Sequence, residues 1–172
     1  VYSNLQWNLV HSYGMYNHYE TAIPVEWSAT YKVEASYEKD AEGNVIGKIS
    51  VPNTALVFDS AQNKWIPINQ AVAENKTYIP GVEGYAGLEG KVPIKVIFNY
   101  DPLSWHHGAK MSVADVMAFL AFMYEWAVDD SQITGQDDPY FDEEYSTAVI
   151  SFLELLKGIE VLNETAIAIY SD

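Results

Sequence analysis

The chain has 172 residues, 49% hydrophobic and 19% charged, which is enough apolar material for one domain with a buried core. Its 24 acidic residues meet nine lysines and no arginine, giving a formal net charge of −15; this charge argues against nucleic acid as a partner and disfavours anionic membrane surfaces. Cysteine is absent, which excludes a disulfide framework, a thiol nucleophile and cysteine-ligated metals.

The first half of the chain is predicted to be rich in β-strands. Apolar and polar residues alternate from 27 to 52 around a turn cluster at 40–44, a pattern typical of a hairpin. A second hairpin is predicted at 55–68. The glycine-rich stretch 70–90 lacks a phosphate-binding pattern and predicts a surface loop. Residues 92–100 alternate again and predict a further strand.

The second half is predicted to begin with a long helix. Ser112 is a suitable N-cap residue, and Asp115 stands where the acid of a capping box belongs. The helix is expected over 113–128 and is apolar nearly all round, which is typical of a helix buried in a larger body. This stretch is too short and too charged to span a bilayer.

A second helix is predicted after an acidic linker, over 142–157. Lys157 would lie in its last turn and Gly158 would follow as the residue that ends it, placements that suit the helix dipole and a left-handed cap. A final hairpin is predicted at 159–170.

These elements predict an α+β fold in which an antiparallel sheet, built from hairpins, carries two main helices. We expect one unit over 1–172, with 1–100 mostly strand and loop, 101–158 helical and 159–172 a terminal hairpin. The nearly uniform apolar character of the first helix indicates a piece of a longer protein.

The abundant acids raise the possibility of a glycoside-cleaving pair of carboxylates. Glu125 is the best single candidate, because it lies near aromatic residues on a helix, where its pKa could be raised. Sequence spacing does not select its partner. Most other acids lie in turns and at helix ends, where solvation or the helix dipole accounts for them, so we expect no catalytic residue.

Two stretches of the sequence bear on metal binding. Counting a calcium loop from Asp130 places Phe141 at the twelfth position, where a bidentate Glu is required. His106 and His107 are adjacent, so in an extended segment they point to opposite sides and do not share one metal. We therefore expect no metal and no cofactor.

The segment from Trp105 to Val116 resembles the signature of the family 5 extracellular solute-binding proteins, the peptide, oligopeptide and nickel receptors of ABC importers. The matching residues are Trp105, His106, Gly108, Met111, Asp115 and Val116. Ser112 stands in for the family's Thr and keeps the capping hydroxyl, whereas His107, Lys110 and Val113 replace its Asp, Pro and Ala. The stretches 51–52 and 55–65 are similar to an archaeal-type branch.

The resemblance implies that Trp105, His106, Gly108, Ser112 and Asp115 are structural residues that shape the turn and cap the helix. It further implies an accessory subdomain of a two-lobed receptor, which captures a peptide or similar solute outside the membrane and delivers it to an ABC permease. The parent would be membrane-anchored, at a cell surface or in a periplasm, and the fragment a monomer. The ligand-contacting residues would lie mostly in the two lobes, so none is assigned.

The sequence is also compatible with two other functions. The 24 aromatic residues and the glycine-rich stretch are also typical of a carbohydrate-binding or cell-surface adhesion module. A glycoside-cleaving enzyme that depends on Glu125 is the second alternative.

Overall fold

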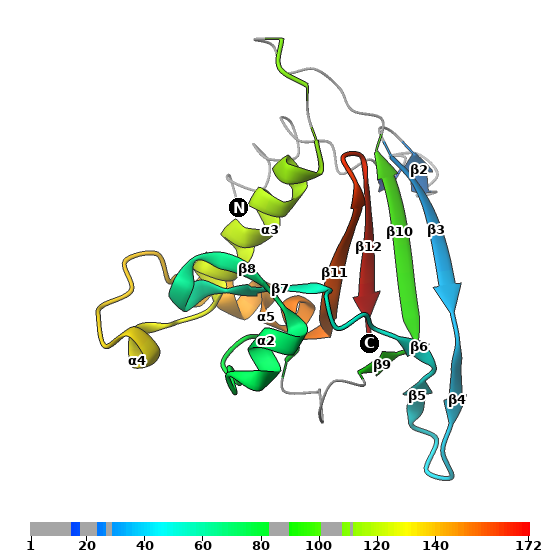
Figure 1. Ribbon diagram of the computed structural model, residues 1–172, viewed down its shortest axis with the longest axis horizontal. Coiled ribbons are helices and arrows are strands. Elements are labelled where there is room, and N and C mark those ends of the chain that lie inside the picture. Colours follow the sequence, from blue (N-terminus) through cyan, green and yellow to red (C-terminus); the bar gives the residue numbers. More distant parts are fainter. Residues whose placement is uncertain (1–14, 18–23, 27–28, 83–89, 101–107, 111) are drawn as a thin grey trace.

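A computed structural model (Figure 1) describes residues 15–17, 24–26, 29–82, 90–100, 108–110 and 112–172. Its centre is a six-stranded antiparallel sheet with the order β3-β10-β12-β11-β7-β8. The strands are β3 (Ala29–Ala35), β10 (Ile94–Tyr100), β12 (Ala166–Ser171), β11 (Leu156–Asn163), β7 (Leu56–Asp59) and β8 (Lys64–Pro67). The predicted α+β class with an antiparallel sheet is confirmed.

Short two-stranded ribbons and helices complete the described part of the chain. The ribbons pair β1 (Met15–Asn17) with β2 (Pro24–Glu26), β4 (Tyr37–Lys39) with β5 (Val45–Gly47), and β6 (Ile49–Ser50) with β9 (Lys91–Val92). The helices are the 3-10 turn η1 (Ser60–Gln62), α2 (Ile68–Ala73), α3 (Val113–Ala127), α4 (Ser131–Thr134) and α5 (Glu143–Leu155). None of these described helices has the length and apolar composition needed to cross a bilayer.

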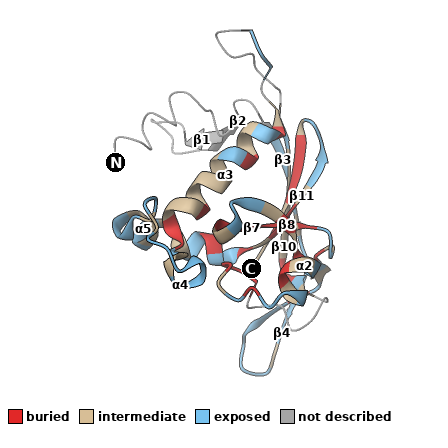
Figure 2. Cartoon of the chain, turned by 60° about the vertical axis from the view of Figure 1, so that its left-hand side comes forward, coloured by how far each residue is buried: buried red, intermediate tan, exposed pale blue. Residues whose placement is uncertain are grey.

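One face of the sheet packs against α3 and α5. Residues paired across strands share a face, and Phe98 on β10 is paired with Ile167 on β12. Ile167 and Ile159 form a buried cluster with one side of α3. The cluster's members on that helix are Val113, Met117 and Leu120. Figure 2 shows the buried residues of α3, in red, facing the sheet, whereas α4 and β4 are exposed.

The opposite face of the sheet packs against α2 and the turn that follows it. Ala168 and Tyr170 of β12 alternate with the residues of the first face, and they cluster with Ile68, Ala71 and other buried side chains. Gly158 on β11 leaves the room for this packing, because a Cβ there would lie 2.8 Å from Ile68 Cδ1. The sheet therefore separates two apolar cores.

The start of α3 has the predicted capping box. Ser112 Oγ accepts a hydrogen bond from Ala114 N at 3.2 Å, and Ser112 N donates to Asp115 Oδ2 at 2.8 Å. Val113 N also donates to Glu164 O, 3.0 Å away in the turn between β11 and β12. The helix thus begins directly on the terminal hairpin. The capping box satisfies two backbone donors at the helix start and the hairpin satisfies a third, all of which would otherwise lack partners.

The hairpin predicted at 27–52 is only partly right. The turn at 40–44 does join two paired strands, β4 and β5. β3, however, pairs with β10, and β6 pairs with β9. The local alternation predicts the strands themselves, but it does not show which distant strand each one pairs with.

Two further predictions are wrong. The described part of the stretch 70–90 is not simply a surface loop, because α2 extends to Ala73 and both Ile79 and Val82 are buried. Residues 83–89 lie outside the described residues. The second helix ends at Leu155, so Lys157 and Gly158 belong to strand β11. Gly158 is used for the close approach of Ile68 and does not cap a helix.

Candidate functional site

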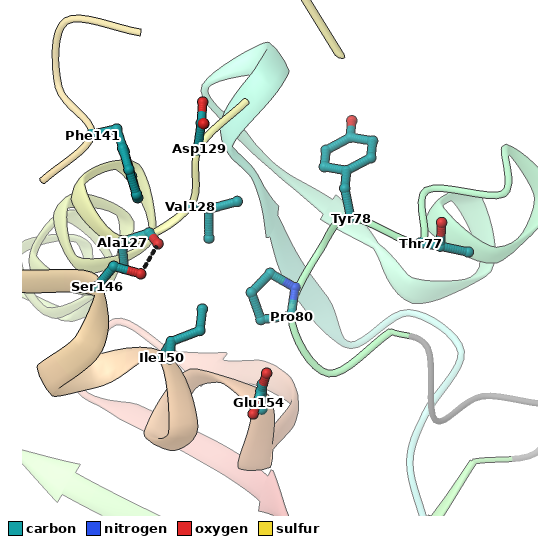
Figure 3. A pocket seen from close by; sticks show the side chains of 10 residues that line it. All are labelled: Thr77, Tyr78, Pro80, Ala127, Val128, Asp129, Phe141, Ser146, Ile150 and Glu154. Carbon is teal, nitrogen blue, oxygen red and sulfur yellow. Dashed lines mark hydrogen bonds between the residues drawn. The ribbon is translucent and has the colours of Figure 1, made fainter. Parts of the chain in front are cut away.

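An open cleft of about 490 Å³ lies between the turn after α2, the C-terminal end of α3 and the face of α5 that carries Ser146, Ile150 and Glu154 (Figure 3). It is lined by Thr77, Tyr78, Pro80, Ala127, Val128, Asp129, Phe141, Ser146, Ile150 and Glu154. Its size falls in the range of small-molecule sites. Sequence analysis did not identify these residues as a site, because they come from separate segments.

The first wall of the cleft is held by contacts between α3 and α5. Ser146 Oγ donates to Ala127 O at 2.7 Å, and Asp142 N donates to Trp126 O at 3.1 Å. Asp142 is also the N-cap of α5, since its Oδ1 accepts from Tyr145 N at 2.8 Å. The two helix ends therefore form one fixed wall.

The second wall is the turn that contains Lys76 and Tyr78. Lys76 Nζ lies 2.8 Å from Asp59 Oδ2 and 3.2 Å from a Glu74 carboxylate oxygen, and Tyr78 Oη donates to Asp59 Oδ1 at 2.7 Å. Nζ contacts Oδ2 as an ion pair without aligned hydrogen-bond geometry. Asp59 is 0% exposed. Contact with its carboxylate raises the pKa of Lys76 above the ordinary lysine value, and this outweighs the opposing effect of burial.

Gly81 brings this turn close to the end of α5. Its φ is +85°, and a Cβ at this position would lie 2.2 Å from Leu156 O. Glycine is needed both for the left-handed backbone and for the approach of two backbones. The position of Pro80 in the cleft therefore depends on the absence of a side chain at residue 81.

The electrostatic character of the cleft is negative. Asp129 and Glu154 supply carboxylates, and none of the ten lining residues is basic. Asp129 Oδ1 accepts from Ser131 N at 2.9 Å. Hydrogen bonds from the Ser131 side chain and backbone lower the pKa of Asp129, so this exposed carboxylate stays charged into the acidic range.

Three further acids lie together near the end of α3. Burial raises the pKa of Glu125, and the carboxylates of Asp130 and Asp138 raise it further. Burial also raises the pKa of Asp130, again with contributions from neighbouring acids. Within the described residues, Glu125 Oε2 is buried without a hydrogen-bond partner. This carboxyl is therefore easier to protonate than an ordinary glutamate.

The structure places the candidates from the sequence as follows. Glu125 comes near two carboxylates but is not among the residues that line the cleft. In the described ranges no three His, Asp or Glu side chains form a possible metal site, and this includes the loop after Asp130. His106 and His107 lie outside the described residues.

The family-type motif is only partly within the described residues. Gly108 has a φ of +92°, and Ser112 and Asp115 form the capping box, whereas Trp105 and His106 lie outside the described ranges. The motif residues that are described thus shape and cap the start of α3, at the opposite end of this helix from the cleft.

Sequence reasoning missed the group formed by Asp59, Lys76 and Tyr78. The available signal was weak: Asp59 directly follows the apolar residues 56–58, and Lys76 stands close before Ile79 in a stretch that was expected to be exposed. A charged residue next to a buried run needs a partner, but the sequence does not indicate which one.

Comparisons with known proteins add no family assignment. Neither a scan against protein-family models nor a search of curated proteins found a match to this chain.

Proposed function

We propose that the chain is the accessory lobe of a peptide-type solute-binding protein, the component of an ABC importer that captures peptides or similar solutes outside the membrane. The observation that carries this proposal is the contact between the start of α3 and the terminal hairpin. The helix begins at a capping box, and its Val113 N donates a hydrogen bond to Glu164 O in the terminal hairpin, so the start of α3 and the hairpin form one unit.

The described residues of the motif support the proposal through their roles. Gly108 adopts a positive φ before the helix, Ser112 replaces a threonine without loss of the capping hydroxyl, and Asp115 closes the box. These are structural roles, which agrees with a lobe that supports a receptor without performing chemistry. Lys110 stands where the family pattern has proline, and it does not interrupt the helix, which starts at Val113.

In this function the parent protein works by a population shift. Solute binds the closed arrangement of two lobes better than the open one, and closure presents the loaded receptor to a permease. The accessory lobe contributes a rigid body, with one core on each side of its sheet. The parent would act outside the membrane while anchored to it, and this lobe requires no cofactor.

The test uses the full-length polypeptide that contains this chain. We expect saturable binding of members of a peptide library, measured by calorimetry, together with a decrease in the radius of gyration in solution scattering when peptide is added. The Ser112→Ala variant serves as a control that weakens the helix cap without touching a ligand site. A full-length protein that binds no peptide or other solute, or that contains no further lobes, would contradict the proposal.

A carbohydrate-binding or adhesion module is the second candidate, and one observation favours it. Tyr31 on β3 and Tyr37 on β4 are 43% and 56% exposed, and exposed aromatic rings can stack on sugar rings. A glycan panel tested against this chain distinguishes the two functions. Saturable sugar binding that is lost in Tyr31→Ala and Tyr37→Ala would favour the adhesion module over the receptor lobe.

A further inference from the structure

We propose that the cleft between the turn at 76–82 and the ends of α3 and α5 is a binding site for an alkylammonium group, that is, a protonated amine at the end of an apolar chain. This inference goes beyond the proposed function, because it concerns a site on the lobe itself. It does not require that the parent protein is a receptor.

The charges of the cleft select a cation. Asp129 and Glu154 are exposed acids that line it, and Figure 3 shows them at opposite ends of the cleft. The nearest cation on the adjoining turn, Lys76, is already engaged by Asp59 at 2.8 Å and Glu74 at 3.2 Å. Within the described residues neither lining carboxylate forms an ion pair, so their negative charge would repel an anionic ligand.

The space between the two acids selects an apolar body. Pro80, Val128 and Ile150 point into the middle of the cleft in Figure 3, between Asp129 and Glu154. Burying an alkyl chain of a few carbons against such walls strengthens binding about fourfold for each CH₂ group that is fully covered. A small inorganic cation would leave these walls in water, so the walls favour an amine that carries a hydrocarbon chain.

Two aromatic rings add a preference for the ammonium group. Phe141 and Tyr78 lie on either side of Asp129 in the view of Figure 3. A cation near the face of such a ring is attracted by the ring's quadrupole. Tyr78 shows this tendency within the protein, since Lys76 Nζ lies 5.8 Å from its ring centroid. The Asp129 end is therefore the expected position of the ammonium head.

The walls of the site are prepared before a ligand arrives. The hydrogen bond from Ser146 to Ala127 fixes one wall. The hydrogen bond from Tyr78 to Asp59 and the contact of Gly81 with Leu156 fix the other. A prepared site loses less conformational entropy on binding than a flexible one, so a small amine can bind without a folding step.

The first experiment is a titration of the chain with n-hexylamine, followed by amide chemical shifts, and a parallel titration with n-hexanol. The two probes have the same apolar chain, but only the amine is charged at neutral pH. We expect saturable shifts centred on the cleft residues for hexylamine, much weaker shifts for hexanol, and weaker amine binding at high salt. Equal binding of both probes, or no saturable binding of the amine, would overturn the proposal.

Variants assign the binding to the cleft. Asp129→Asn should weaken hexylamine binding about two- to fivefold, the range expected for an exposed ion pair, and Glu154→Gln, at the other end of the cleft, should weaken it less. Both side chains are exposed, so the variants should fold. Glu42→Gln is the matched control, because it removes one carboxylate from the turn between β4 and β5. If the control weakens binding as much as Asp129→Asn, the amine is attracted only by net charge and the site does not exist.

A titration with a third probe distinguishes the source of the ammonium group. The blocked tripeptide acetyl-Ala-Lys-Ala-amide presents a lysine side chain on a polypeptide, whereas hexylamine represents a free amine. Binding of the tripeptide at the same residues would identify a lysine-bearing polypeptide segment, and preference for hexylamine would identify a free amine. Failure of the parent protein to bind peptides would leave this result unaffected, so the two proposals are tested separately.

Discussion

The turn at 76–78 and the C-terminal end of α3 both place ionisable side chains near the cleft, but only the turn pairs opposite charges. In the turn, Lys76 and Tyr78 both contact the fully buried Asp59. At the end of α3, the charged groups that act on Glu125 among the described residues are Asp130 and Asp138, and its pKa is raised. A carboxylate is therefore a structural link in one region, where it is buried with a cation, and a source of repulsion in the other, where it is half-buried among acids.

The largest effect is expected when the buried Asp59 loses the lysine that neutralises it. Lys76→Met leaves Asp59 buried without its cation, so the free energy of unfolding should fall by about 3–5 kcal/mol. Urea denaturation measures it. The double variant Asp59→Asn, Lys76→Met should recover most of the loss, because it removes the buried charge. A loss below about 1 kcal/mol would show that the pair contributes no more than a surface ion pair.

The second prediction tests whether the close packing of Gly81 against Leu156 O holds the turn in place. Gly81→Ala should lower the free energy of unfolding by about 2–4 kcal/mol, since it combines a strained positive φ with a collision at Leu156 O. Gly43→Ala is the matched control, because Gly43 also has a positive φ but open space around it. The control should lose about 1 kcal/mol. Equal losses would mean that the close approach of the turn to α5 is unimportant.

The third prediction concerns the opposite end of α3, where a side chain accepts a hydrogen bond from the first turn of the helix backbone. Ser112→Ala removes the capping hydroxyl and should cost about 1 kcal/mol in the free energy of unfolding. Ser151→Ala, at an exposed position within α5, serves as the control and should change stability by less than about 0.5 kcal/mol. Similar losses in both variants would argue against the cap as the source of the effect.

The smallest effect is expected from removing one carboxylate from the acidic group at the end of α3. The folded-state pKa of Glu125 is raised, so its contribution to stability is favourable below the unfolded-state pKa and is lost as pH rises through the folded-state pKa. Glu125→Gln should therefore increase stability at neutral pH by about 0.5 kcal/mol and leave it unchanged below about pH 4. Urea denaturation at the two pH values measures this difference, and a gain that is the same at both would contradict it.

The same variant tests the glycosidase alternative. Turnover of a chromogenic glycoside by the native chain, lost in Glu125→Gln but kept in Glu42→Gln, would contradict a function without catalysis. Absence of turnover in the native chain would remove the one candidate catalytic residue that the sequence offered.

The parts of the fold that local patterns determine were predictable. The capping box at Ser112 and Asp115, the helix after it, and the hairpin of β7 and β8 all follow from residues close together in the sequence. Pairing of β3 with β10 was not predictable, because the alternation in 29–35 fits any partner strand. The local signals at Lys157 and Gly158 favoured a helix end, but packing of Ile68 against the glycine determined the outcome.

The cleft could not be predicted for the same reason. Asp59 and Lys76 are 17 residues apart and are separated by a hairpin turn, a strand and a short helix. Tyr78 and Glu154 meet at the cleft only after both layers have packed on the sheet. A single sequence shows the residue types but not these distant contacts.

The place of β12 in the sheet has a consequence for how the molecule is made. This strand is the last one described along the chain, yet it lies between β10 and β11 in the middle of the sheet. On the ribosome, β3 and β10 can join early, but the two halves of the sheet stay separate until residue 171 has emerged. Ile167 and Ala168 then enter the two cores at once, so loss of this segment would divide the sheet and not merely trim its edge.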